Sequence, residues 1–259
     1  MSMIYPDLKE FKEKAGEGNL IPVYKEILAD LETPLSAFLK MKGKTGFLLE
    51  SLEGGEKWAR YSFIGSNPSM IIEGRKGNLT IRRGNEKEQL GVVSDPLNVV
   101  EEKLKKFKPV IMPGLPRFFG GFVGYIGYDT VRHFERLPDR KHPGLNLPDI
   151  FLMYTDTLLV FDNLTHTIKV ISNAHIQDSP ELAYEQALLK IDSIVNKLKA
   201  KAVVPKRKPS PQTADTDAAA FSSNFIKEDF MRAVEKTKEY ILAGDIIQAV
   251  ISQNFHRQT

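Results

Sequence analysis

The sequence of 259 residues contains no cysteine, and this absence removes several kinds of chemistry at once. Without thiols the chain cannot form disulfides, use a cysteine nucleophile or build a zinc–thiolate site. The absence fits a reducing compartment, and we expect a cytoplasmic location. No positively charged segment followed by an apolar run opens the chain, so the sequence predicts no signal peptide. No uncharged apolar stretch is long enough to span a bilayer, and we expect no membrane association.

The chain also lacks a strong surplus of charge of either sign. Its formal net charge is +3, which is too small to indicate a nucleic-acid partner. A basic cluster at 206–208 lies among prolines and is more typical of a solvated linker. The five histidines are scattered and form no metal-ligand spacing, so we predict no metal site in this chain. The hydrophobic content of 42% is nevertheless sufficient for a sizeable core.

Apolar runs come mostly in pairs joined by short turns. The segments "GFLLESLEGGEKWARYSFIG", "SMIIEGRKGNLTIRRG" and "IFLMYTDTLLVFDNLTHTIKVIS" each predict a β-hairpin of two apolar runs, the last turning near Asp162. Amphipathic helices are predicted where Thr33, Asp95 and Ser179 each stand before a proline. Strands paired as hairpins, rather than alternating with helices, favour an α+β fold with antiparallel sheets and helices packed outside them.

A change of composition divides the chain. We expect an N-terminal domain over 1–200, followed at 201–221 by a flexible linker without periodicity. Over 222–259 the sequence predicts a helix that ends near Gly244 and a buried strand from Ile246 to Phe255. One helix and one strand cannot bury both faces of the strand. We therefore expect 222–259 to begin an incomplete second domain, and the chain to be the N-terminal part of a longer polypeptide.

Three glycines spaced three apart occur in "GGFVGYIGYD". A dinucleotide-binding fingerprint needs such glycines at a strand-to-helix turn, and no helix is expected here. We predict instead a strand in which glycines allow another backbone or a ring to approach closely. The sequence also contains no P-loop, GxSxG or HExxH motif.

The first hairpin places polar residues where a buried pattern favours apolar ones. Alternation puts Leu49 and Ser51 on one face and Glu50 on the other, and the turn brings Ser62 opposite or near Ser51. A carboxylate, two hydroxyls and an apolar wall together suit a small zwitterion. In the simpler alternative Glu50 points to water and the serines cap the strand ends. The pattern by itself favours that alternative.

Four segments carry a resemblance to a known family. "GNLIPVYKEILADLETPLSAFLK", "FLLESLEGGEKWARYSFIG", "GGFVGYIGYD" and "AGDIIQAVISQNF" resemble the N-terminal half of anthranilate synthase component I. The LLES motif and the serine that follows it resemble this family's feedback-inhibitor element. The resemblance implies that L-tryptophan binds at the hairpin and favours a low-activity state. It makes Ser51 the expected contact, with Leu49, Glu50 and Ser62 lining the site.

The resemblance also implies an activity. The family converts chorismate and ammonia into anthranilate and pyruvate, with Mg²⁺ on the substrate carboxylate and ammonia supplied by a glutamine amidotransferase subunit. The glycine-rich strand and the G-D-x-x-Q element are shared with aminodeoxychorismate synthase, but LLES favours the anthranilate enzyme. Aminodeoxychorismate synthase and a non-catalytic amino-acid-binding regulatory module remain the alternatives.

Gln248 is the candidate catalytic residue that the resemblance assigns to this chain. Related chorismate enzymes that add water have a lysine at this place as a base, and a neutral amide suits an enzyme whose nucleophile is ammonia. The alternative is a buried amide satisfied by neighbouring backbone. Ile247 and Asn254 depart from the family, which commonly has an aromatic residue and an arginine there.

Other elements that the resemblance implies lie further along in the family. These are the glutamates that bind magnesium, the elements that clamp chorismate, and the Asn-Pro-x-x-Tyr-Met half of the tryptophan site. None occurs in these 259 residues. We therefore expect that this chain alone does not catalyse the reaction and binds tryptophan weakly or not at all.

Overall fold

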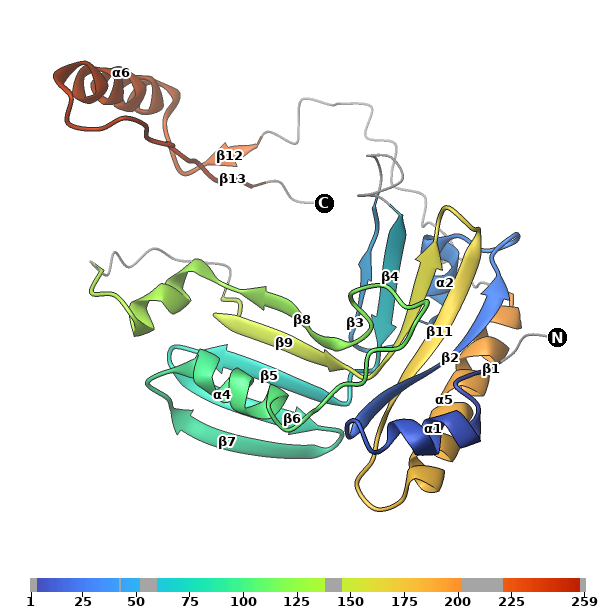
Figure 1. Cartoon of the computed structure of the whole chain (residues 1–259). Coiled ribbons are helices and arrows are strands. Elements are labelled where there is room, and N and C mark those ends of the chain that lie inside the picture. The colour runs from blue at the N-terminus through green and yellow to red at the C-terminus, as the bar shows by residue number, and fades with distance from the viewer. Residues whose placement is uncertain (1–3, 42, 52–59, 138–145, 202–220, 257–259) are drawn as a thin grey trace. The chain divides into compact units, whose positions relative to one another are not determined.

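The structure is a computed structural model that describes residues 4–41, 43–51, 60–137, 146–201 and 221–256 (Figure 1). The chain divides into two compact units, Met1–Val204 and Pro205–Thr259. Nearly all of the predicted linker lies outside the described residues, so its flexibility stays a prediction.

The first unit contains a six-stranded antiparallel sheet, here called sheet A, in the order β1-β2-β11-β10-β4-β3. Its long strands are rich in Ile, Val, Leu and Phe, residue types that pack well on a pleated surface. Successive residues alternate between the two faces, so apolar runs supply a core on both sides. The strands of sheet A are β1 (Ile4–Tyr5), β2 (Leu20–Leu28), β3 (Gly46–Leu49), β4 (Tyr61–Ser66), β10 (Thr157–Asp162) and β11 (Thr167–His175).

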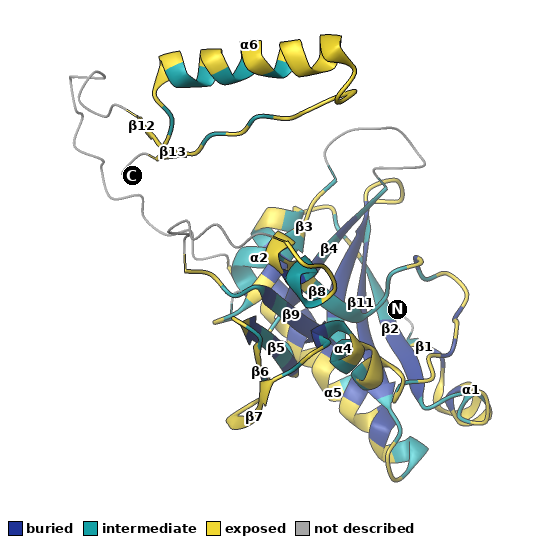
Figure 2. Cartoon of the chain, turned by 90° about the vertical axis from the view of Figure 1, so that its left-hand side faces the viewer, coloured by how far each residue is buried: buried dark blue, intermediate teal, exposed yellow. Residues whose placement is uncertain are grey.

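Helices cover one face of sheet A. The longest of them, α5, turns a buried stripe toward the sheet and leaves its other side exposed, as Figure 2 shows. Its buried positions Ala187, Ile191 and Val195 share a core cluster with Ile21 and Leu159 of the strands. Sheet A is thus shielded on this side by α1 (Leu8–Lys14), α2 (Pro34–Met41) and α5 (Pro180–Lys199).

The helices begin where the sequence predicts. The side chain of Ser179 accepts a hydrogen bond from the backbone N–H of Leu182 at 3.2 Å. Thr33 and Ser36 cap each other reciprocally, with bonds of 2.9 and 3.1 Å between the side-chain oxygen of one and the backbone N–H of the other. Asp95 accepts from two N–H groups of the first turn of α4 (Pro96–Leu104). These caps satisfy donors that a helix start otherwise leaves unpaired.

A second antiparallel sheet of five strands, here called sheet B, has the order β7-β6-β5-β9-β8. Leu97 and Val100 of α4, with Phe107 just after it, pack against the buried residues of this sheet. All residues of β7 are exposed, and no apolar alternation in its sequence indicates a strand. The strands of sheet B are β5 (Met70–Arg75), β6 (Asn78–Arg83), β7 (Glu86–Val92), β8 (Gly121–Ile126) and β9 (Ile150–Thr155).

The chain passes from sheet B to sheet A at Asp156, which corrects one prediction. The run "IFLMYTDTLLVFD" was predicted as a single run of a hairpin, but it forms β9 in one sheet and β10 in the other. The carbonyl oxygen of Asp156 accepts from the backbone N–H of Asn173 at 2.7 Å and from its side chain at 3.1 Å. These bonds hold the bend, so the segment Ile150–His175 contains three strands. The expected turn after Asp162 joins β10 to β11.

The glycine-rich segment forms β8, as predicted, and it pairs along its length with β9. A Cβ atom on Gly124 would lie 1.9 Å from the carbonyl oxygen of Phe151, so a glycine is needed for this close approach. A short 3₁₀ helix, η1 (Tyr128–His133), does follow the strand, contrary to expectation.

The second unit contains α6 (Lys227–Ala243), which ends at Gly244 with a φ of +81°, as predicted. The predicted buried strand from Ile246 to Phe255 is wrong. Residues 246–250 are exposed and not in a strand, and only β13 (Phe255–His256) pairs, with β12 (Ser222–Ser223). The physical reason is that the described part of this unit offers no further strand to pair with and no second layer to bury it. Within the described residues, no helix combines the length and the apolar character needed to cross a membrane.

Candidate functional site

The predicted hairpin is present as the antiparallel pair β3–β4, which forms one edge of sheet A. Its last described pairing joins Leu49 to Phe63. Continuing that register places Glu50, not Ser51, opposite Ser62. Ser62 is therefore offset by one residue from the position opposite Ser51, and in a strand an offset of one residue means the opposite face. The expectation that the two serines are directly opposed is corrected, while the expectation that Ser62 lies near Ser51 stays a prediction. The connecting residues 52–59 lie outside the described residues.

Ser62 faces the helical layer. It is fully buried, and in β4 it lies opposite Phe161 of β10, whose side chain belongs to the same core as α2 and α5. Its hydroxyl accepts a long hydrogen bond of 3.5 Å from the side-chain amide of Asn163. A hydrogen bond of this length is weak, so the buried hydroxyl is held loosely by its one recorded partner.

Leu49 lies on the other face of the hairpin, and its side chain is 47% exposed. Phe63, which pairs with Leu49 in the neighbouring strand, packs edge-on against Phe118, with ring centroids 5.3 Å apart. The ring centroid of Tyr61 lies 6.3 Å from that of Phe63. The aromatic rings thus form an apolar surface beside the exposed Leu49. Sequence reasoning missed Phe118, because nothing in "PRFFGG" indicates that it packs on a strand about fifty residues earlier.

An ion pair fixes the start of β4. Arg60 donates to Asp162 with three hydrogen bonds of 2.6, 2.9 and 3.1 Å, and its guanidinium lies 5.0 Å from the ring centre of Tyr61. Burial opposes ionisation of Asp162. The bonds from Arg60 and from the backbone N–H groups of Leu164 and Thr165 outweigh it, and the pKa of this carboxyl lies below its usual value.

The hairpin end therefore combines three kinds of surface. Glu50 is an exposed carboxylate, Ser51 is half-buried next to it, and Leu49 borders an aromatic surface. A carboxylate can accept from an ammonium group, and an apolar surface can cover a ring. Of the four predicted residues, Leu49, Glu50 and Ser51 lie at the surface, while Ser62 lies inside the sheet.

Gln248, the candidate catalytic residue, belongs to the second unit and is exposed in a segment without regular structure. The strand that was expected to fix its side chain is not formed. Among the described residues, no group of three or more His, Cys, Asp and Glu side chains is placed to hold a metal ion. The described residues thus do not fit the magnesium that the resemblance implies.

Comparison with known proteins assigns the family. The model of the chorismate binding enzyme family matches residues 47–259. The chain therefore belongs to the chorismate-binding enzyme family. Its fold of helices and antiparallel sheets is similar to the crystal structure of anthranilate synthase component I from Streptococcus pneumoniae, with a TM-score of 0.51 and 24% identity, covering 85% of this chain and 46% of that one.

Comparison with curated relatives shows which enzymes of the family the chain resembles. The chain is 42% identical to anthranilate synthase component 1 of Acetivibrio thermocellus, over 99% of this chain and 52% of that protein. It is 42% identical to the same component of Aquifex aeolicus, over 97% of this chain and 50% of that protein. It is 40% identical to the component of Pseudomonas aeruginosa, over 95% of this chain and 50% of that protein. The resemblance to anthranilate synthase component I is thus confirmed. The chain spans about half the length of the curated relatives it matches.

Proposed function

We propose that this chain forms part of the large subunit of an anthranilate synthase, which converts chorismate and ammonia into anthranilate and pyruvate. The observation that carries the proposal is the identity of about 40% with relatives named anthranilate synthase component 1, which extends over nearly the whole chain. The same names support a second component as partner, for which we propose the glutamine amidotransferase that releases ammonia.

L-Tryptophan is the proposed effector of the β3–β4 hairpin. Its indole ring would cover the apolar surface at Leu49 and Phe63, and its ammonium group would hydrogen-bond to Ser51 on the same face. The exposed carboxylate of Glu50, one residue beyond the end of β3, would pair with that ammonium group from the strand end. Ser62 would respond indirectly, because it lies inside the sheet behind the site. Feedback requires that tryptophan bind a low-activity state more tightly than the active one.

Chemistry at chorismate requires protein beyond the described residues. Gln248 and its neighbours from 246 to 250 are exposed, and a catalytic side chain must be fixed in place to act. We propose that a second polypeptide segment, corresponding to the half of the relatives that this chain does not span, covers this region. We also propose that the magnesium ligands belong to that segment, and that this chain alone is inactive.

A chimera tests these proposals. Residues 1–259 would be joined to the second half of the Acetivibrio thermocellus relative, and product formation from chorismate and ammonium salt would be followed by anthranilate fluorescence and by mass. The chimera is expected to form anthranilate and to lose activity when L-tryptophan is added. Residues 1–259 alone serve as the control and are expected to be inactive. Release of aminodeoxychorismate would favour the alternative enzyme, and turnover by residues 1–259 alone would overturn the proposed need for a second segment.

A further inference from the structure

Sheet B has one edge that is protected and one that is open. The strand β7 forms the first edge, and its sequence "EKEQLGV" begins with three charged residues. Its pairing with β6 is interrupted by a register shift between Leu79 and Thr80. Charged side chains and bulges keep edge strands from pairing with other chains. The strand β8 forms the other edge, and its sequence "GFVGYI" has no charged residue, no proline and no register shift.

The edges of sheet A are protected in another way, because their strands are short. The strand β1 has two residues and β3 has four, so each offers few backbone groups to a partner. In contrast, β8 has six residues, and every one of them is held in extended pairing with β9. Within the described part of the first unit, β8 is therefore the edge best suited to accept a further strand.

The pairing of β8 shows which of its backbone groups are available. The N–H of Gly127 donates to the carbonyl oxygen of Asp149 at 2.7 Å, in the register that joins β8 to β9. Backbone groups of successive residues in a strand point to opposite sides. Phe122, Gly124 and Ile126 therefore direct their N–H and C=O groups away from β9. Among the described strands, none pairs with this side of β8.

Apolar side chains are exposed at the same place. Ile126 is 50% exposed, and Tyr128, which follows the strand, is 80% exposed. Tyr125 stacks on Phe151 of β9 with ring centroids 6.3 Å apart, and it is still 41% exposed. Single exposed apolar residues are ordinary, but a group of them beside an open strand edge marks an interaction surface. An added strand would pair with the open backbone groups and cover these side chains together.

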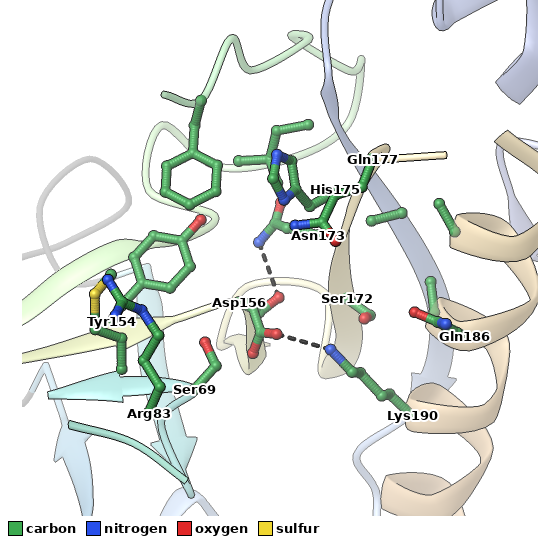
Figure 3. A pocket seen from close by; sticks show the side chains of 16 residues that line it. Ser69, Arg83, Tyr154, Asp156, Ser172, Asn173, His175, Gln177, Gln186 and Lys190 are labelled. Atoms are coloured by element: carbon green, nitrogen blue, oxygen red, sulfur yellow. Dashed lines mark hydrogen bonds and ion pairs between the residues drawn. The ribbon is translucent and has the colours of Figure 1, made fainter. Parts of the chain in front are cut away.

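The junction of the two sheets prevents the first unit from covering this edge itself. The carboxylate of Asp156 lies 2.7 Å from the ammonium of Lys190 on α5, and its carbonyl oxygen accepts from the side-chain amide of Asn173 at 3.1 Å. Figure 3 shows these bonds at the cavity of about 310 Å³ where the two sheets and α5 meet. A rotation of sheet B that carried β8 onto a strand of sheet A would break them.

The extent of the family match and the length of the relatives indicate the occupant. The family model matches residues 47–259, so the whole of sheet B belongs to the region that defines the chorismate binding enzymes. The relatives are about twice as long as the part of them that this chain spans. They therefore contain about as much polypeptide again, and this polypeptide can supply a strand to sheet B.

We propose that a strand from the half of the relatives that this chain does not span adds to the open edge of β8 and extends sheet B. Tyr125 and Ile126 lie on opposite faces of β8, so the added strand is expected to be apolar on both faces. The inference rests on the proposed function, in which that half completes the enzyme.

Hydrogen–deuterium exchange tests the added strand. The chimera of residues 1–259 with the second half of the Acetivibrio thermocellus relative would be compared with residues 1–259 alone, in peptides that cover β8 and β7. Amide exchange in β8 is expected to slow about tenfold or more in the chimera, because the outward N–H groups gain partners. The strand β7 is the internal control and is expected to exchange equally in both proteins. Equal exchange of β8 in both would overturn the proposal.

Residues 1–259 alone also test a second copy of the chain as the occupant. Exchange in β8 is expected to be independent of protein concentration. Slower exchange at higher concentration would show that β8 pairs with β8 of another copy, and the second half would then be the wrong occupant.

Matched variants test the position of the added strand. Ile126→Lys places a charge on the open edge, as β7 has on its own edge. In the chimera it is expected to return β8 exchange to the rate of residues 1–259 and to lower the melting temperature by about 3 °C or more. Val92→Lys changes an apolar residue of β7 that is 79% exposed, and this control is expected to alter neither quantity. Slow exchange that persists in Ile126→Lys would contradict pairing at this edge.

Failure of folding does not obscure the result. The exchange comparison of the parent proteins needs no variant, so it decides the proposal even if Ile126→Lys does not fold. A chimera that circular dichroism shows to be unfolded would be replaced by one with the second half of the Aquifex aeolicus relative. A chimera that forms anthranilate while β8 exchanges as in residues 1–259 would overturn the added strand alone. Slow exchange of β8 in a folded chimera that forms no anthranilate would support the added strand and overturn the proposed function.

Discussion

Arg60 and Asp162 join the two strands that support the candidate effector site, with hydrogen bonds of 2.6 to 3.1 Å between guanidinium and carboxylate. Arg60 directly precedes β4, and Asp162 ends β10 beside it. The Asp162 side chain is 3% exposed and also accepts from the backbone N–H groups of Leu164 and Thr165. One carboxylate thus fixes both the start of β4 and the turn after β10.

Asp162→Asn is expected to lower the free energy of unfolding by about 1–3 kcal/mol, because charge-assisted bonds are lost in a buried position. Chemical denaturation at neutral pH measures this. Asp178→Asn, which changes an exposed aspartate in a loop, is the control and is expected to have little effect. Equal stability of the two variants would show that the ion pair does not hold the hairpin.

The same carboxylate predicts a dependence on acid. The pKa of Asp162 is lowered in the folded chain, so its contribution is present above its unfolded pKa of about 3.9 and is lost as the pH falls through the lower folded value. The parent chain is therefore expected to lose stability more steeply than Asp162→Asn below about pH 4. Denaturation midpoints measured over this range for both proteins check the prediction, and parallel curves would contradict it.

The burial of His175 leads us to expect a second, milder dependence of stability on pH, in a higher pH range. Burial lowers the pKa of its imidazole, so the unfolded chain binds a proton more readily than the folded one. Stability is therefore expected to decrease as the pH falls from about 7 through the unfolded value of about 6.5 toward the folded pKa. His175→Gln is expected to flatten this slope in thermal melts, while His166→Asn in an exposed turn is expected to retain it.

Gly124 predicts a local requirement for glycine. A Cβ there would meet the carbonyl oxygen of Phe151 at 1.9 Å, and backbone cannot move aside as a flexible side chain can. Gly124→Ala is expected to destabilise the chain by about 2 kcal/mol or more through disrupted pairing of β8 with β9. Gly16→Ala, whose Cβ would meet nothing closer than 3.6 Å, is the control. Similar melting temperatures for the two variants would contradict the close approach.

Local signals in the sequence predicted much of the fold. Ser179 and Asp95 have side chains that cap the following turn, and Gly244 adopts a backbone conformation that favours glycine, so helix ends are set by nearby residues. The apolar pattern of β4, β5 and β11 likewise reflects burial that each strand needs. These features depend on a few neighbouring residues, and a single sequence contains them.

Features that depend on distant partners were not predictable. The bend at Asp156 is held by Asn173 from another strand, and β7 is a strand only because β6 pairs with it. The hairpin register, which places Glu50 and not Ser51 opposite Ser62 when continued, depends on pairing that alternation does not specify. The segment around Gln248 shows the converse, because its apolar pattern predicted a strand that the described part of its unit gives nothing to pair with.

The face assignments at the hairpin lead to a prediction about feedback in the chimera. Glu50→Gln and Ser51→Ala each remove a surface group proposed to contact the tryptophan ammonium, and each is expected to raise the tryptophan concentration for half-inhibition about tenfold. Leu49→Ala is expected to act in the same direction, because it removes part of the apolar surface under the indole ring. Activity without tryptophan is expected to persist, since these residues are proposed to contact the effector and not chorismate.

Glu86→Gln on the exposed strand β7 is the matched control for the loss of one carboxylate, and its inhibition is expected to equal that of the unaltered chimera. Steady-state assays at rising tryptophan concentration, with anthranilate fluorescence as readout, measure all of these variants. Ser62 faces the core and not the effector, so Ser62→Ala is expected to shift inhibition less than Glu50→Gln does. If Ser62→Ala had the larger effect while Leu49→Ala and Ser51→Ala had none, tryptophan would bind on the helical side of the sheet, and the surface site at Leu49 and Ser51 would be wrong.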